Sequence, residues 1–178
     1  MPGYTAPPGI RERNFSSWVE KSYSPVNTLT SVSINQSTDL IGIWIDEKNL
    51  RAYVYNINTQ SSPILINLDD GTFTELDATD ENMSQFSEKN ANIQYGGGGV
   101  NSIGGKYQVI PTVGFGTTQS VLRIYKNGVL VQTITVESGV NVGHGTQAIS
   151  PSGKFIVVWS RSAVAPVFGR IHVYQGQA

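Results

Sequence analysis

The chain has 178 residues, a length that predicts one domain large enough to bury a core. Twelve basic side chains nearly balance thirteen acidic ones, and charged residues make up only 14% of the chain, so neither nucleic acid nor a membrane surface is expected as the main partner. The absence of cysteine excludes disulfides, thiolate catalysis and cysteine-ligated metals.

The first segment, residues 1–13, is expected to be an extended arm that folding does not require. Its prolines lack the amide donor that a strand ladder needs. A free tail and an arm docked on a neighbour are both consistent with this composition. No basic region precedes an apolar run, and no stretch approaches the roughly 18 apolar residues that span a bilayer, so neither a signal peptide nor a membrane span is predicted. This pattern favours an intracellular protein or part of a virion, without fixing a compartment.

Residues 14–178 are expected to form a single all-β domain. Alternating or continuously apolar runs rich in β-branched residues predict strands, which occur in the first half at 15–23, 31–34, 40–45, 50–57, 63–68 and 73–76. The last two flank an Asp-Asp-Gly sequence, whose Asp-Gly pair favours a hairpin turn. Residues 79–90 break the pattern: Thr79 can cap a helix whose face would carry Met83 and Phe86, so one short helix is predicted there.

Strand patterns resume in the second half of the chain. They occur at 93–95, 107–115, 121–125, 129–136, 146–149, 155–160 and 170–174. Asn127-Gly128, between two apolar runs, is the strongest hairpin signal in the sequence. The elements together predict antiparallel meander sheets.

Three passages repeat one pattern of a turn, an apolar strand and a second strand ending in tyrosine. The clearest copy begins with Ser150-Pro151-Ser152-Gly153-Lys154, continues through the apolar run 155–159 and ends with Arg170-Ile171-His172-Val173-Tyr174. A second copy, at 34–55, places Trp44 where the clearest copy has Trp159, and both are expected to be buried. A looser copy runs from residue 101 to 125.

This pattern resembles a blade of WD40-like or related β-propellers, and His144 resembles the histidine of the Gly-His pair that opens a WD40 blade. No copy closes with Trp-Asp, and three copies fall short of the four or more blades of a propeller. The resemblance therefore implies an incomplete propeller that belongs to a larger one or self-assembles, with the strand near 15–23 completing the last sheet. Chance similarity among β-meanders, and a β-sandwich or jelly roll, are the alternatives.

No catalytic, cofactor-binding or metal-binding residue is predicted. The glycine-rich stretch 96–106 lacks the spacing of a phosphate-binding loop, and Tyr107 replaces the Ser or Thr that would hold magnesium. Neither His144 nor His172 has a carboxylate at i+2 or i+4, and His172 alternates with apolar residues as a strand-face residue does. The acidic stretches 69–71 and 77–81 do not follow the calcium-loop pattern, and no Gly-x-Ser-x-Gly sequence occurs.

The sequence therefore favours a non-enzymatic scaffold or protein-interaction module that assembles through sheet edges and loops. Its expected partner is a protein, either further copies in a homo-oligomer or a larger assembly. A structural subunit of a virion or surface assembly is an alternative, because low charge with many amides and hydroxyls is commoner in such proteins. A carbohydrate-binding or hydrolytic β domain is a weaker alternative.

Overall fold

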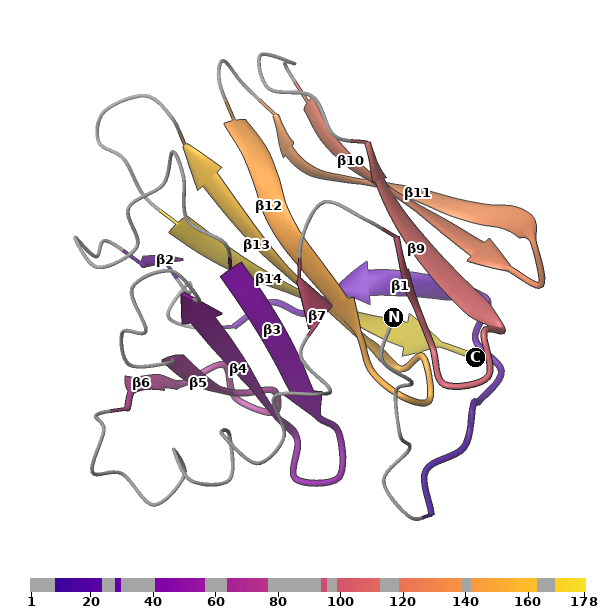
Figure 1. Cartoon of the computed structure of the whole chain (residues 1–178), viewed down its shortest axis with the longest axis horizontal. Helices are drawn as coiled ribbons and strands as arrows, with labels where there is room; N and C mark the ends of the chain where they lie inside the picture. Colours follow the sequence, from indigo (N-terminus) through magenta and orange to yellow (C-terminus); the bar gives the residue numbers. More distant parts are fainter. Residues whose placement is uncertain are drawn as a thin grey trace.

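The computed structural model describes residues 9–23, 28–29, 41–56, 64–76, 94–95, 99–112, 119–138, 142–162 and 169–178. Within these ranges the chain forms fourteen strands in three antiparallel sheets, and no helix (Figure 1). The predicted all-β class is confirmed. The helix predicted at 79–90 lies outside the described residues.

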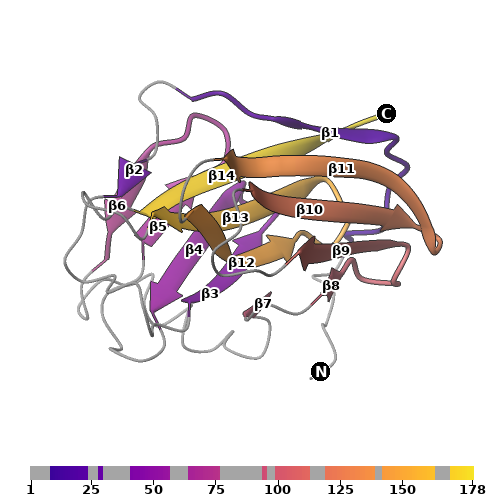
Figure 2. The same cartoon turned by 90° about the horizontal axis from the view of Figure 1, so that it is seen from above.

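Sheet A is built from both ends of the chain. Its order is β1–β14–β13–β12, and β2 also pairs with β14. The strands are β1 (Ser17–Glu20), β2 (Thr28–Leu29), β12 (Val142–Ile149), β13 (Phe155–Ser162) and β14 (Gly169–Gln177). Trp18 pairs with Gly176 and Glu20 with Tyr174, so the N-terminal strand lies beside the C-terminal one (Figure 2). The expectation that an N-terminal strand completes the last sheet is confirmed.

Sheet B has the order β6–β5–β4–β3–β7. Its strands are β3 (Ile41–Asp46), β4 (Arg51–Asn56), β5 (Ile64–Asn67), β6 (Phe73–Glu75) and β7 (Gln94–Tyr95). The predicted Asp-Gly turn lies between β5 and β6, and Gly71 has a φ of 77°. That backbone conformation is one that glycine adopts readily.

Sheet C is a meander with the order β11–β10–β9–β8. Its strands are β8 (Val100–Asn101), β9 (Tyr107–Thr112), β10 (Gln119–Lys126) and β11 (Val129–Ser138). Asn127 and Gly128 join β10 to β11 with φ values of 50° and 79°. Two consecutive positive φ values are what a tight two-residue hairpin turn requires, so the hairpin predicted at this position is confirmed.

Sheet A is the middle layer of three. Its strand β12 lies against β3 and β7 of sheet B and against β8 and β9 of sheet C. Along β13, Phe155, Val157 and Trp159 belong to the apolar cluster between sheets A and B, whereas Ile156 and Val158 belong to the cluster between sheets A and C. Full burial of such side chains stabilises the fold by about 1.5–3 kcal/mol each, so these two interfaces form the core.

The turn before β13 is held by its serine and glycine. Gly153 N donates to Ser150 O at 2.9 Å, and Phe155 N donates to Ser150 Oγ at 2.9 Å. Gly153 has a φ of 86°, which a residue with a Cβ rarely adopts. The Ser-x-x-Gly-Lys sequence therefore specifies this turn through one side-chain hydrogen bond and one unusual backbone angle.

The turn before β9 has the same construction. Gly105 N donates to Ser102 O at 3.0 Å, Tyr107 N donates to Ser102 Oγ at 3.0 Å, and Gly105 has a φ of 78°. Tyr107, the equivalent of Phe155, packs between sheets C and A, whereas Phe155 packs between sheets A and B. Tyr107 of sheet C thus faces sheet A, and the equivalent Phe155 of sheet A faces sheet B.

The two tryptophans expected to be equivalent are both buried. Trp44 lies on β3 and Trp159 on β13, the strands that follow the turn in their copies of the repeat. The Trp44 ring stacks on Tyr53 of β4, with 4.9 Å between ring centroids. The predicted burial of both residues is confirmed.

Candidate functional site

Because the sequence predicts no catalytic residue, the candidate site is a surface that could bind a protein. Strand β11 forms an outer edge of sheet C and begins with three consecutive exposed apolar residues. Val129 is 65% exposed, Leu130 49% and Val131 39%. No charged residue occurs from 129 to 136. We call residues 129–131 the apolar edge; the turn beside it projects from the margin of the molecule (Figure 1).

The β10–β11 hairpin is anchored to the N-terminal segment at two points. Lys126 Nζ donates to Asn14 Oδ1 at 2.6 Å and to Phe15 O at 3.1 Å. Gln132 Nε2 donates to Trp18 O at 2.8 Å, while Trp18 N donates to Gln132 Oε1 at 2.7 Å. The Gln132 amide thus satisfies the backbone of β1 as a neighbouring strand would. The outer edge of β1 therefore has its backbone groups satisfied at Trp18, whereas the apolar edge stays exposed.

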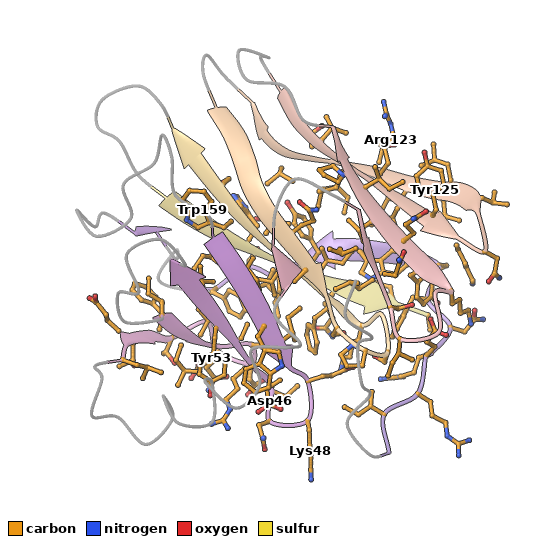
Figure 3. All side chains as sticks on the ribbon, viewed as in Figure 1. Asp46, Lys48, Tyr53, Arg123, Tyr125 and Trp159 are labelled. Carbon is orange, nitrogen blue, oxygen red and sulfur yellow. The ribbon has the colours of Figure 1, made fainter. Side chains whose placement is uncertain are left out.

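The outer face of sheet C is continuous with the apolar edge. Leu122 and Ile124 of β10 pack toward sheet A, so the alternation of strand side chains places Arg123 and Tyr125 on the outer face. Figure 3 shows both side chains directed away from β12. A single cation thus lies among uncharged side chains on this part of the face.

A hydroxyl, an imidazole and a carboxylate form a polar row across three strands of sheet A. His172 Nε2 lies 3.0 Å from Ser160 Oγ, and His172 Nδ1 lies 3.0 Å from Glu20 Oε1. Ser160 comes from β13, His172 from β14 and Glu20 from β1. Sequence reasoning missed this row, because Ser160 and His172 meet through the pairing of β13 with β14, and the distant Glu20 joins them only through the pairing of β1 with β14.

The row has the order of groups found in serine hydrolases, in which a carboxylate orients a histidine that activates a serine. Ser160 is only 1% exposed, however, and its position two residues after Val158 places it with Ile156 and Val158 on the face packed against sheet C. A substrate would have to separate the two sheets to reach its Oγ. In this arrangement the hydrogen bonds of the polar row join the side chains of β1, β14 and β13 and stabilise the position of β1 in sheet A.

The end of the N-terminal segment contacts the β5–β6 turn of sheet B. Tyr23 Oη donates to Leu68 O at 2.6 Å, and Lys21 Nζ donates to the same carbonyl at 2.7 Å. Burial, together with the negative charges of Asp69 and Asp70, raises the pKa of Tyr23 well above its ordinary value. This hydroxyl therefore stays protonated where ordinary tyrosines ionise.

Across the described ranges, no group of three or more His, Asp or Glu residues is placed to hold a metal ion. In the same part of the chain, no helix has the length and hydropathy needed to cross a membrane. Comparison of the chain with protein-family models, with curated proteins and with solved structures found no match.

Proposed function

We propose that the protein is a non-enzymatic interaction module that assembles with further copies of itself or with a partner protein through the apolar edge and the adjoining outer face of sheet C. The exposure of Val129, Leu130 and Val131 on an edge strand is the observation that carries this proposal. An exposed apolar edge offers unpaired backbone groups to another chain, and natural proteins usually protect such edges with charge.

The lack of charge along β11 supports the same function. Two antiparallel strands with no charged residue from 129 to 136 can pair without placing like charges opposite each other. The nearby edge of β1 is already engaged by Gln132 at Trp18. Strand β11 is also the longest strand at the edge of a described sheet.

The stacking of the sheets supports an assembly of propeller-like blades. Tyr107 and Phe155 are equivalent residues, and each covers the next sheet in the order C, A, B. The outer face of sheet C is the end of this stack that carries Arg123 and Tyr125. A sheet from another chain packed on this face would continue the stack, as blades do in a propeller.

Sedimentation velocity over a range of protein concentrations tests the proposal. The wild type is expected to associate as its concentration rises, and Val131→Lys is expected to weaken that association by placing a charge in the apolar edge. Val19→Lys is the matched control, since Val19 is an exposed apolar residue on the edge strand β1. A single 19.3 kDa species at every concentration, with or without Val131→Lys, would contradict self-assembly.

A further inference from the structure

A groove of about 410 Å³ lies between the N-terminal segment 9–13, the turn at 47–50 and the turn at 150–154. Four cationic side chains line it: Arg11, Arg13, Lys48 and Lys154. They are a third of the twelve Lys and Arg residues in a chain whose net charge is −1. We call this feature the basic groove; Figure 3 shows Lys48 at the tip of the β3–β4 turn beside it.

Among the described residues, Glu47 is the only carboxylate that lines the basic groove, and the fold already holds it. Ser152 N donates to Glu47 Oε2 at 3.1 Å, and Ser152 Oγ donates to Glu47 Oε1. The ion pairs between described residues are Lys21–Asp69, Arg51–Asp46 and His172–Glu20. None of the four groove cations takes part in these pairs, so their positive charge is available to an anionic ligand.

The turn before β9 in sheet C also binds a carboxylate. There Glu12 Oε2 accepts hydrogen bonds from Lys106 N at 2.8 Å and from Ser102 Oγ. In both turns a carboxylate of the chain itself already accepts from a backbone amide and from a serine hydroxyl, that of Ser102 in sheet C and that of Ser152 in sheet A. A further anion at the basic groove would therefore be bound by the Arg and Lys side chains.

The walls of the groove are held in place before any ligand binds. Arg13 N donates to Ser152 O at 3.0 Å, and Arg13 O accepts a hydrogen bond from Tyr107 Oη at 2.7 Å. These bonds join the N-terminal segment to sheets A and C. A preformed site loses less conformational entropy on binding than a loop that must first become ordered.

Apolar side chains complete the lining. Ile10 and Leu50 line the groove, as does residue Phe155, whose ring is buried between sheets A and B with Lys154 Nζ 5.1 Å from its centre. Leu50 has a φ of 51°, an unfavourable angle for leucine, yet its side chain is exposed. Two hydrogen bonds hold its backbone in this conformation: Leu50 N donates to Glu47 O at 3.2 Å, and Leu68 N donates to Leu50 O at 2.8 Å. An exposed leucine held at a strained position suits a wall that contacts a ligand.

From this geometry we infer that the basic groove binds a small organic polyanion, with two or more phosphate or carboxylate groups on an apolar body. Guanidinium groups recognise phosphate and carboxylate through paired hydrogen bonds, while the apolar wall contacts the ligand body. The volume falls within the range of small-molecule sites, about 300–1,000 Å³. This site is separate from the apolar edge and does not depend on the assembly proposed above.

Titration of the full chain with four probes at low salt tests the inference. Adenosine diphosphate should bind saturably, with a Kd on the order of 0.1–1 mM. Pyrophosphate and citrate, which carry the charges without the apolar body, should bind more weakly, and the stronger of the two identifies the preferred anion. Adenosine, which lacks the charges, should not bind.

Two substitutions locate the site, and one controls for net charge. Arg11→Gln and Lys48→Gln should each weaken diphosphate binding several-fold, because both exposed cations line the groove. Arg123→Gln removes the same charge from the outer face of sheet C and should leave binding unchanged. The inference is overturned if none of the three polyanions binds saturably below about 10 mM, if adenosine binds as well as its diphosphate, or if Arg123→Gln weakens binding as much as Arg11→Gln.

Discussion

Gly153 lies directly against the ring of Tyr107, so closely that a Cβ atom at position 153 would overlap the ring. The carbonyl oxygen of Gly153 also accepts a hydrogen bond from Trp18 Nε1 at 2.8 Å. The turn of sheet A, the first residue of β9 in sheet C and the N-terminal strand therefore meet at one glycine. At Gly105, the equivalent glycine in the turn before β9, an added Cβ would have no atom within 4 Å.

We predict that Gly153→Ala lowers the free energy of unfolding much more than Gly105→Ala. Both glycines have a positive φ, so each substitution carries a backbone cost of about 1–2 kcal/mol. At Gly153 the added methyl must also displace the Tyr107 ring, and the total loss is expected to reach about 3 kcal/mol or more. Chemical denaturation of both variants measures the difference. Equal losses would show that the ring moves away without cost.

The N-terminal segment gives a second prediction. Deletion of residues 1–8 should leave the thermal transition nearly unchanged, whereas deletion of residues 1–13 should lower stability by about 2–4 kcal/mol. The longer deletion removes the carboxylate of Glu12 from Ser102 and Lys106, and the backbone bond from Arg13 to Ser152. The sequence predicted that all thirteen residues are dispensable, whereas the contacts of Glu12 and Arg13 indicate that the end of this segment contributes to stability. Identical transitions for the two deletions would contradict the assigned contacts.

Substitutions of the tryptophans separate the contribution of side-chain burial to stability from that of the indole hydrogen bond. Trp44→Ala and Trp159→Ala are each expected to cost about 3–5 kcal/mol, because both side chains are buried in apolar clusters. Trp18→Phe should cost more than Trp159→Phe, since Trp18 Nε1 donates to Gly153 O and no described residue accepts from Trp159 Nε1. Urea unfolding of the four variants decides this, and a reversed order for the two phenylalanine variants would count against it.

Local sequence patterns predicted the elements that depend on neighbouring residues. Alternation of apolar side chains located the strands, and Asn127-Gly128 located a hairpin because only a few residues tolerate two positive φ values. The repeat of a turn followed by an apolar strand predicted related turns, and the serine and glycine make the same bonds at 102–105 and at 150–153.

The order of the sheets and the contacts between them could not be predicted in this way. Periodicity indicates which face of a strand is buried, but not which sheet covers it. The hydrogen bonds that Ser102 donates to Glu12 and Ser152 donates to Glu47 join residues 90 and 105 positions apart, and no local sequence pattern marks either residue of a pair. The basic groove was missed for the same reason, because its cations come from three separate segments.

The raised pKa of Tyr23 gives a prediction about alkaline pH. Its ordinary value is 10.0, and burial and then the charges of Asp69 and Asp70 raise it in the folded state. Because the folded chain holds this proton more tightly than the unfolded chain, the contribution to stability is fully present below pH 10 and is lost as the pH rises above it.

We therefore expect the free energy of unfolding of the wild type to fall more steeply above pH 10 than that of Tyr23→Phe, which has no hydroxyl to ionise. The difference in slope should stay below about 1 kcal/mol per pH unit, because solvent at the half-buried ring screens the charges. At neutral pH the variant should be less stable by about 1 kcal/mol, since it lacks the bond to Leu68 O. Denaturation from about pH 8 to pH 11 measures both effects, with Tyr125→Phe, on the outer face of sheet C, as the matched control. If wild type and Tyr23→Phe lose stability in parallel, the Tyr23 hydroxyl is not shielded as its contacts with sheet B require.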